Sequence, residues 1–191
     1  MAKVFDEIGP KLADWIGQQH MFFVGSAPSG DTGHVNVSPK GPIETLRVLG
    51  PRRVAYLDQV GSGIETVAHL RENGRIVIML CAFAGPPRIV RLHGRGRVVE
   101  LDDPEFGELS APFELVPGTI EAEVARSLVV VGLDHISDSC GYGVPLMEFA
   151  GRRTQQADWA RSKLRDDPDG IRAYVRERNA RSIDGLAGID A

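Results

Sequence analysis

The sequence has little cysteine, no long apolar run and no excess of positive charge. No stretch of about 18 consecutive apolar residues occurs, so a membrane-spanning helix is not expected. Neither Cys81 nor Cys140 belongs to a CxxC pair, which argues against a structural zinc site and is typical of a reducing compartment. The formal net charge is −4, whereas a nucleic-acid-binding protein usually carries a basic excess. The stretch 1–7 lacks the apolar core of an export signal, so we expect a cytoplasmic protein that binds neither membranes nor nucleic acid.

The remaining composition is that of a globular protein, with 42% hydrophobic and 25% charged residues. A chain of 191 residues is long enough to bury one substantial core. From Gly151 onward, a few apolar residues stand among many charges, which is typical of exposed helices. We therefore expect a main domain over 1–150 and a helical carboxy-terminal extension over 151–191, packed on the main domain or on a second copy of the chain.

Six or seven segments have the apolar runs or the two-residue alternation of strands. The expected strands are 21–27, 34–38, 45–49, 53–57, 75–83, 88–100 and 128–136. The expected helices are 6–19, 64–72, short pieces within 102–126, 152–165 and 169–180. Strands and helices do not alternate, so the pattern predicts an α+β chain built on an antiparallel barrel with peripheral helices.

The segment 88–100 combines alternation with glycines and with a row of basic residues. Gly94 and Gly96 fall on the apolar side and suggest the bends by which a small barrel closes. Arg91, Arg95 and Arg97 fall on the other side, which is either a solvated outer surface or, at Arg91, a place to hold an anion.

A tight Gly-Ser-Gly turn over 61–63 lies between an apolar strand and the helix expected over 64–72. The first N–H groups of a helix have no intrahelical partner, and the helix dipole is positive there. Together with the hydroxyls of Ser62 and Thr66, the turn predicts a binding site for an anion, most often a phosphate.

A second polar motif, Asn36-Val-Ser-Pro-Lys-Gly41, ends the strand expected over 34–38. Amide, hydroxyl and ammonium groups at a barrel rim suit a polar heterocycle or a phosphate, although an ordinary turn with an exposed lysine gives the same pattern. The loop 139–145 begins Ser-Cys-Gly, but no general base can be identified for it.

The five histidines lack the spacing of metal ligands, so no metal site is expected; they are His20, His34, His69, His93 and His135. His69 stands three residues after Thr66. It either approaches the anion site or occupies an ordinary exposed helix position, and the second reading is favoured.

Three motifs fall in one order along the chain: Asn36–Gly41, Tyr56–Asp58 with Gly61–Thr66, and Gly85–Gly94. This order resembles the pyridoxamine 5′-phosphate oxidase-related proteins, which have the FMN-binding split-barrel fold. The core of the resemblance covers about residues 15–135. The later segments Ser139–Pro145 and Asn179–Leu186 resemble a particular subgroup and extend the match to nearly the whole chain.

The resemblance implies that FMN lies in a groove at a homodimer interface. The strand that matches 36–40 would contact the flavin ring and the ribityl chain, the end of the next strand would line the groove, and the Gly-Ser-Gly turn would receive the phosphate. The implied cofactor contacts, with Arg91 added from across the dimer, are Asn36, Val37, Ser38, Lys40, Leu57, Asp58, Ser62, Gly63, Glu65, Thr66 and Arg91. A carboxylate beside a phosphate is repulsive, so we expect the backbone of Glu65 to make its contact.

The sequence departs from the authentic oxidase, which has an Arg-Lys pair where this chain has Gly63-Ile64. Oxidation of vitamin B6 is therefore not expected, and the missing positive charge would have to come from Lys40, Arg88 or Arg91. We expect a flavoprotein that transfers electrons to or from a small organic molecule, with the flavin doing the redox chemistry. The alternatives are a protein that binds the deazaflavin F420, a haem protein with His20, His69 or His93 as axial ligand, and a non-enzymatic flavin carrier or sensor.

Overall fold

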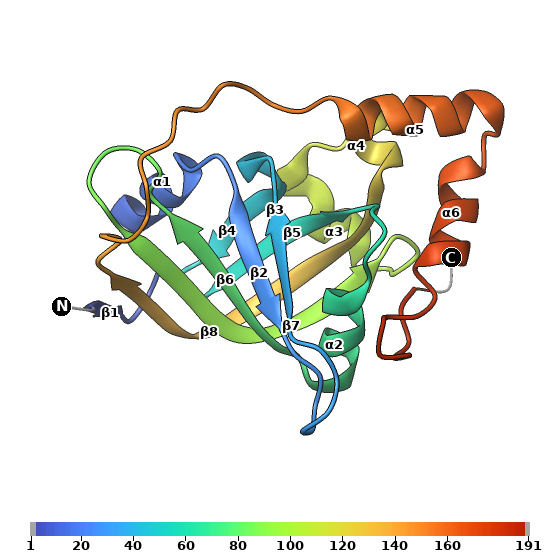
Figure 1. Cartoon of the computed structure of the whole chain (residues 1–191). Coiled ribbons are helices and arrows are strands. Elements are labelled where there is room, and N and C mark those ends of the chain that lie inside the picture. The colour runs from blue at the N-terminus through green and yellow to red at the C-terminus, as the bar shows by residue number, and fades with distance from the viewer. Residues whose placement is uncertain (1–2, 190–191) are drawn as a thin grey trace.

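The computed structural model describes residues 3–189 and shows one antiparallel sheet of eight strands surrounded by helices (Figure 1). The strands are β1 (Lys3–Phe5), β2 (Phe22–Ser26), β3 (Asn36–Lys40), β4 (Leu46–Gly50), β5 (Arg53–Gln59), β6 (Arg75–Cys81), β7 (Ile89–Glu100) and β8 (Ala125–Ser139). Their order is β3-β2-β6-β7-β8-β5-β4, with β1 added to β8. Within the described residues the end strands β3 and β4 do not pair, so the sheet forms a split barrel and the predicted α+β fold is confirmed.

The helices lie outside this barrel. They are α1 (Pro10–Gly17), α2 (Glu65–Asn73), α3 (Phe106–Ser110), α4 (Ile120–Glu123), α5 (Gln155–Asp166) and α6 (Gly170–Arg178), with 3₁₀ turns η1 (Ile43–Thr45) and η2 (Ala111–Phe113). None of the helices in residues 3–189 has the length and apolar character that crossing a membrane requires.

The barrel interior is filled by alternate side chains of its strands, as the two-residue alternation predicts. Phe22, Ile78 and Leu92 have no exposed surface, and Leu12 and Ile16 of α1 join them from one end. The strand β6 covers most of the apolar segment 75–83. Its side chains are buried on the inner side of the barrel and mostly half-buried on the outer side.

The pairing of β7 with β8 is interrupted by a β-bulge at Gly94. A Cβ atom on Gly94 would lie 2.0 Å from the carbonyl oxygen of Gly132, and the pairing shifts register between His93 and Gly94. A side chain at position 94 would therefore force the strands apart, which explains the glycine that the sequence analysis assigned to a bend. Arg95 and Arg97 point to solvent on the outer face.

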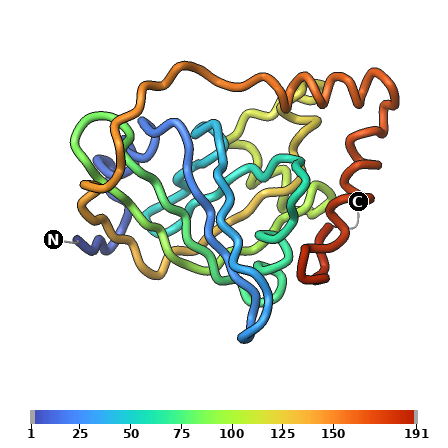
Figure 2. Tube along the Cα trace, in the orientation of Figure 1, coloured from blue at the N-terminus to red at the C-terminus, as the bar shows by residue number. Residues whose placement is uncertain are grey.

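The helices α5 and α6 pack on the side of the barrel near α2. One apolar cluster joins the carboxy-terminal segment to the region around α2. It contains Ala160, Ile171, Val175 and Ile189 from the carboxy-terminal segment, and Val60, Ile64, Val67 and Val124 from the region around α2. An extended segment, Cys140–Thr154, connects β8 to α5 and runs along the outside of the barrel (Figure 2). We call it the strap. Most of its side chains are exposed.

Several element boundaries differ from the sequence analysis. The strand β1 was not expected, and α1 begins at Pro10 rather than at residue 6 because the preceding Gly9 is extended and proline is suited to the first helical turn. The strand β3 begins two residues late, since His34 is bound to Asp184 instead of to a neighbouring strand. The strand β8 is longer than 128–136 at both ends because it pairs with β1, β5 and β7.

Candidate functional site

The turn between β5 and α2 carries a small cavity of about 190 Å³. The chain leaves β5 at Gln59 and begins α2 at Glu65, in the strand, turn and helix order that the sequence predicts. No side chain caps the start of α2, so its first N–H groups are available. We call this cavity the anion seat; its lining residues are Ser38, Pro39, Lys40, Gln59, Gly61, Gly63, Ile64, Glu65, Thr66 and Arg126.

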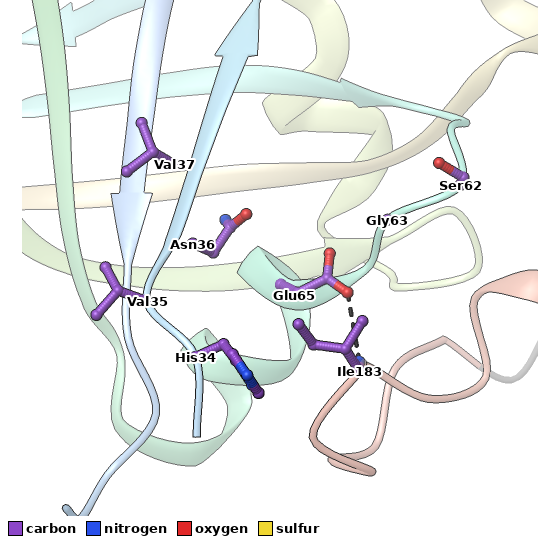
Figure 3. A pocket seen from close by; sticks show the side chains of 8 residues that line it. All are labelled: His34, Val35, Asn36, Val37, Ser62, Gly63, Glu65 and Ile183. Carbon is purple, nitrogen blue, oxygen red and sulfur yellow. Dashed lines mark hydrogen bonds between the residues drawn. The ribbon is translucent and has the colours of Figure 1, made fainter. Parts of the chain in front are cut away.

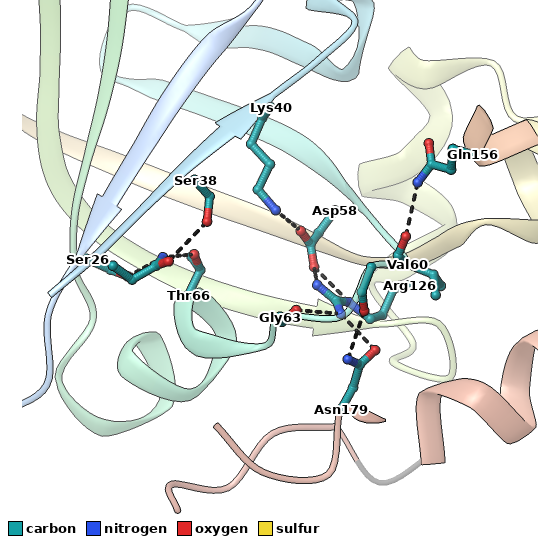
Figure 4. A network of polar contacts seen from close by, with 12 residues as sticks. Ser26, Ser38, Lys40, Asp58, Val60, Gly63, Thr66, Arg126, Gln156 and Asn179 are labelled. Carbon is teal, nitrogen blue, oxygen red and sulfur yellow. Dashed lines mark hydrogen bonds and ion pairs between the residues drawn. The ribbon is translucent and has the colours of Figure 1, made fainter. Parts of the chain in front are cut away.

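An almost completely buried ion-pair network lies at the base of the anion seat (Figure 4). The guanidinium of Arg126 donates from Nε and Nη2 to Oδ2 of Asp58, at 2.9 and 2.6 Å, and Nζ of Lys40 donates to Oδ1 of Asp58 at 2.8 Å. The side chains of Asp58 and Arg126 are 2% and 3% exposed. Asp58 therefore lies beneath the groove and orients two cations, rather than lining the groove as the resemblance implied.

The two cations also determine the ionisation of Asp58. Burial raises the pKa of this carboxyl, but the charges and hydrogen bonds of Lys40 and Arg126 outweigh burial and hold its pKa below the usual value. Asp58 is thus an anion at neutral pH, and it neutralises one of the two positive charges.

Arg126 also fixes the turn itself. Its Nη1 donates to the carbonyl oxygen of Gly63 at 3.0 Å and to Oδ1 of Asn179 at 2.8 Å. The amide of Asn179, which is fully buried, donates to the carbonyl oxygen of Gly61 at 3.0 Å. The segment after α6 is therefore docked on the Gly-Ser-Gly turn, and it completes the wall of the site.

A second network directs hydroxyl groups at the anion seat (Figure 4). Ser38 Oγ donates to Oδ1 of Asn36 at 3.1 Å. The amide nitrogen of Asn36 donates to Oγ1 of Thr66 at 2.9 Å and to Oγ of Ser26 at 3.3 Å. Because Thr66 accepts in this network, its own hydroxyl hydrogen remains available for an anion.

His69 supports this second network from inside the protein. It has no exposed surface, and its Nδ1 lies 3.0 Å from Oγ of Ser26. Desolvation lowers its pKa, so the ring is neutral at pH 7. The favoured reading of His69 as an exposed helix residue is therefore wrong. Its Nε2 is buried without a hydrogen-bond partner among the described residues.

A second cavity of about 480 Å³ lies on the outer side of the turn (Figure 3). Its lining residues are His34, Val35, Asn36, Val37, Ser62, Gly63, Glu65 and Ile183. A carboxylate oxygen of Glu65 accepts from the backbone N–H of Ile183 at 3.4 Å, so this side chain is turned toward the carboxy-terminal segment. The turn is therefore surrounded by two carboxylates and two cations, which are Asp58, Glu65, Lys40 and Arg126. Their charges cancel, so an anion would be attracted by directed hydrogen-bond donors rather than by net charge.

The remaining expected residues are placed as follows. Leu57 lines a third and larger cavity, together with Lys40. Arg91 lies on β7, which is separated from β3 by the two strands β2 and β6, and it donates to Oγ of Ser139 at 3.0 Å. Arg88 is paired with Asp138. Within one chain, Lys40 and Arg126 are therefore the cations at the anion seat, while Arg88 and Arg91 lie elsewhere.

Sequence reasoning missed Arg126, Asn179 and Ser26. Arg126 precedes the apolar run 128–131, which predicts the start of a strand. An arginine at the head of a buried strand needs a buried partner, and Asp58 is the acidic residue at the end of another such strand. That correspondence was a usable signal, and the resemblance of Asn179–Leu186 to a family subgroup was one for Asn179, whereas no local pattern marks Ser26.

No family model matches this chain. A curated protein of Aspergillus flavus, described as "Pyridoxamine 5'-phosphate oxidase family protein ustO", is 36% identical over 198 residues, which cover 97% of this chain and 77% of that protein.

Two crystal structures of HupZ from Group A Streptococcus share the fold. One has a TM-score of 0.52 at 15% identity and covers 69% of this chain and 99% of its own. The other has a TM-score of 0.50 at 15% identity, with coverages of 68% and 91%. Such low identities support the barrel architecture alone. The much closer match to the Aspergillus flavus protein shows more, and the chain belongs to the pyridoxamine 5′-phosphate oxidase family.

Proposed function

We propose that this chain is a flavoprotein that binds FMN and transfers electrons to or from a small organic substrate. The observation that carries the proposal is the anion seat, where Lys40, Arg126, the Thr66 hydroxyl and the start of α2 converge between a barrel strand and a helix. Family membership supports the choice of a phosphorylated flavin as the anion.

The residues of the anion seat fit a phosphate group. Phosphate oxygens accept several hydrogen bonds at once, and an unbonded hydroxyl hydrogen, an ammonium group and free helix N–H groups are suitable donors. Lys40, Thr66 and the backbone of 63–66 would bind the phosphate, while Arg126 holds the turn and Asp58 in place. The polar end of β3, with Asn36 and Ser38, would orient the rest of the cofactor. A bound flavin supplies the electron transfer, and the protein supplies position and hydrogen bonds.

A homodimer with the cofactor at its interface is part of the proposal. The strand β3 is an end strand of the sheet, and Val35 and Val37 at this edge are 76% and 65% exposed. Two such valines beside a polar cavity are better explained by a partner surface than by contact with water. In this arrangement Arg91 of the partner subunit could complete the groove. We also propose a cytoplasmic location, which the free thiols Cys81 and Cys140 suit.

Oxidation of vitamin B6 is not proposed. Gly63 and Ile64 stand where the authentic oxidase has its Arg-Lys pair, and the described residues around the turn supply Arg126 from a different strand instead. The substrate and the electron partner therefore need separate evidence.

The test is the absorption spectrum of the purified protein, followed by titration of the apoprotein with FMN. Two bands of oxidised flavin would support the proposal, whereas a single F420 band or a Soret band would support one of the alternative cofactors. A protein that binds FMN but is neither reduced by NAD(P)H nor reoxidised by any acceptor would be a carrier or sensor. A protein without a chromophore whose spectrum and stability do not respond to FMN would refute the proposal.

The binding site is tested by one substitution and its control. Thr66→Val removes the directed hydroxyl and keeps the side-chain volume, so the Kd for FMN should rise about tenfold, the value of one charge-assisted hydrogen bond. Thr154→Val is the matched control, because Thr154 is exposed and its side chain caps nothing. Equal effects of the two changes would show that the phosphate does not bind at the anion seat.

A further inference from the structure

The largest of the three cavities lies under the strap and encloses about 840 Å³. We call it the strap pocket. It shares Pro39, Lys40 and Gln59 with the anion seat, so the two cavities are neighbours along the same groove. A volume of this size accommodates a small organic molecule.

One wall of the strap pocket is apolar. These side chains come from β5, from the turns and loops around η1, η2 and α4, and from the strap itself: Ile43, Leu57, Phe113, Leu115, Val124 and Phe149. Phe149 is 53% exposed and stacks on His20, with ring centroids 3.9 Å apart and planes 9° apart. An aromatic residue held flat at the edge of a cavity offers a surface for another ring.

The polar rim of the strap pocket carries more positive than negative charge. Lys40, Arg47, Arg152 and Arg153 line it, against the carboxylates of Glu44 and Glu121, and Lys40 is further neutralised by the buried Asp58. Arg152 is paired with Glu44. Arg153 has no carboxylate partner within residues 3–189.

The other cations of the rim are already engaged with the protein. Nε of Arg47 donates to the carbonyl oxygen of Pro112 at 2.9 Å, and its guanidinium lies over the Phe113 ring, 5.6 Å from the centroid. Arg153 therefore carries the positive charge that a ligand can use most readily. Its planar fork matches a carboxylate in two parallel hydrogen bonds.

From these observations we propose that the strap pocket binds an apolar, ring-containing molecule with a single carboxylate, whose anion is held by Arg153 and whose ring packs against Phe149. A monoanion matches the single rim cation without a carboxylate or carbonyl partner in the described chain, Arg153, whereas a phosphate dianion would be left undercompensated beside Glu44 and Glu121. The claim that this molecule is the substrate rests on the proposed function, because it requires a flavin in the neighbouring anion seat. The claim that the strap pocket binds the molecule is independent of that function.

Three contacts hold the described strap over the pocket, and they are weak. They are the hydrogen bond from Met147 N–H to the Phe83 carbonyl oxygen, the stacking of Phe149 on His20, and the exposed ion pair of Arg152 with Glu44. An exposed ion pair contributes little, so a ligand could displace the strap locally on entry. This agrees with a pocket that exchanges small molecules.

The experiment is a fluorescence titration of the full-length protein, without added flavin, with 2-naphthoate and with its neutral analogue 2-naphthylmethanol. We expect the carboxylate to bind about tenfold more tightly than the alcohol, and 2-naphthyl phosphate to bind less tightly than the carboxylate. Arg153→Gln should abolish the preference for the carboxylate and leave the affinity for the alcohol unchanged. Arg161→Gln, the same change on an exposed arginine of α5, should preserve the preference.

A second variant tests the ring contact. Phe149→Ala should weaken the carboxylate and the alcohol by the same factor, since it removes apolar surface and no charge. Equal affinity of the wild-type protein for the two probes, or an unchanged preference in Arg153→Gln, would overturn the proposal. An FMN titration separates the two proposals: FMN binding without naphthoate binding refutes the strap pocket alone, and the converse refutes the flavin proposal alone.

Discussion

Replacement of Arg126 by methionine tests whether the buried network holds the site together. Methionine keeps much of the arginine volume and removes the charge and all hydrogen bonds. Four of these bonds go to Asp58, Gly63 and Asn179, and the side chain is 3% exposed, so water cannot replace them.

The expected loss of stability depends on the buried carboxylate of Asp58, which remains in the variant. Removing one partner of a buried ion pair costs about 3–5 kcal/mol, because the other charge remains buried and uncompensated. Lys40 still contacts Asp58, so we expect the lower end, about 3 kcal/mol. For a chain of this size, each kcal/mol lowers Tm by about 2–4 °C, which gives a decrease of about 6–12 °C. The affinity for FMN should fall as well, since the carbonyl of Gly63 loses its anchor.

Urea unfolding and thermal unfolding measure this loss. Arg161→Gln is the comparison, because its pair with Asp158 is 62% and 61% exposed and should contribute less than about 1 kcal/mol. The double variant Arg126→Met/Asp58→Asn, compared with the two single variants, measures the coupling between the two residues, which should be more than about 1 kcal/mol. A decrease of less than about 1 kcal/mol in the unfolding free energy of Arg126→Met would refute the reasoning, because the loss of a surface ion pair has an effect of that size.

Three further predictions concern the site and the barrel. Lys40→Met should raise the Kd for FMN about tenfold in an equilibrium titration, because an ammonium contact is lost, while Arg91→Met should change it only if the partner subunit contributes. Desolvation lowers the pKa of His69 in the fold, so below about pH 6.5 the unfolded chain binds more protons and the free energy of unfolding falls as the pH decreases; His69→Gln should flatten this dependence in urea titrations at several pH values. Gly94→Ala should lower Tm by more than about 5 °C in thermal unfolding, because the new Cβ would lie 2.0 Å from the Gly132 oxygen.

Each of these predictions has an opposing outcome. An unchanged Kd in Lys40→Met would place the phosphate away from β3. Stability that depends on pH equally in the wild type and in His69→Gln would assign the titration to another group, of which His93 is the first choice because desolvation lowers its pKa too. Gly107→Ala is the control for the glycine change, since nothing lies within 4 Å of the added Cβ and alanine favours the helix. Equal losses at the two glycines would show that the bulge between β7 and β8 tolerates a side chain.

Much of the fold could be read from the sequence because its signals are local. The alternation in 88–100, the apolar run of β6 and the glycine turn before α2 each depend on residues close together in the chain. These patterns reflect one buried face or one tight turn, which neighbouring residues suffice to define. For the same reason Thr66 could be proposed for the anion site, whereas Asn36 was assigned to it by the family resemblance and Ser62 lines the outer cavity.

The errors arose where a residue's role depends on distant partners. Asp58 has the appearance of a ligand at the end of a strand, but Arg126, 68 positions later, converts it into a buried counter-ion. His69 has the helical spacing of a surface residue, yet β2 supplies Ser26 to bury it. Such roles are set by tertiary pairing, which a single sequence encodes only through the need of each buried charge for a partner.

The long strand β8 has a consequence for the order in which the molecule folds. Its 15 residues pair with β1, β5 and β7, and the register joins Lys3 to Asp138. Both halves of the barrel are thus joined through a strand that leaves the ribosome after two thirds of the chain. Until then β5 and β7 expose the edges that β8 later covers, and exposed edges invite pairing with other chains. Contacts this distant in sequence also slow folding. We therefore expect nascent chains that stop before β8 to be the species most in need of a chaperone.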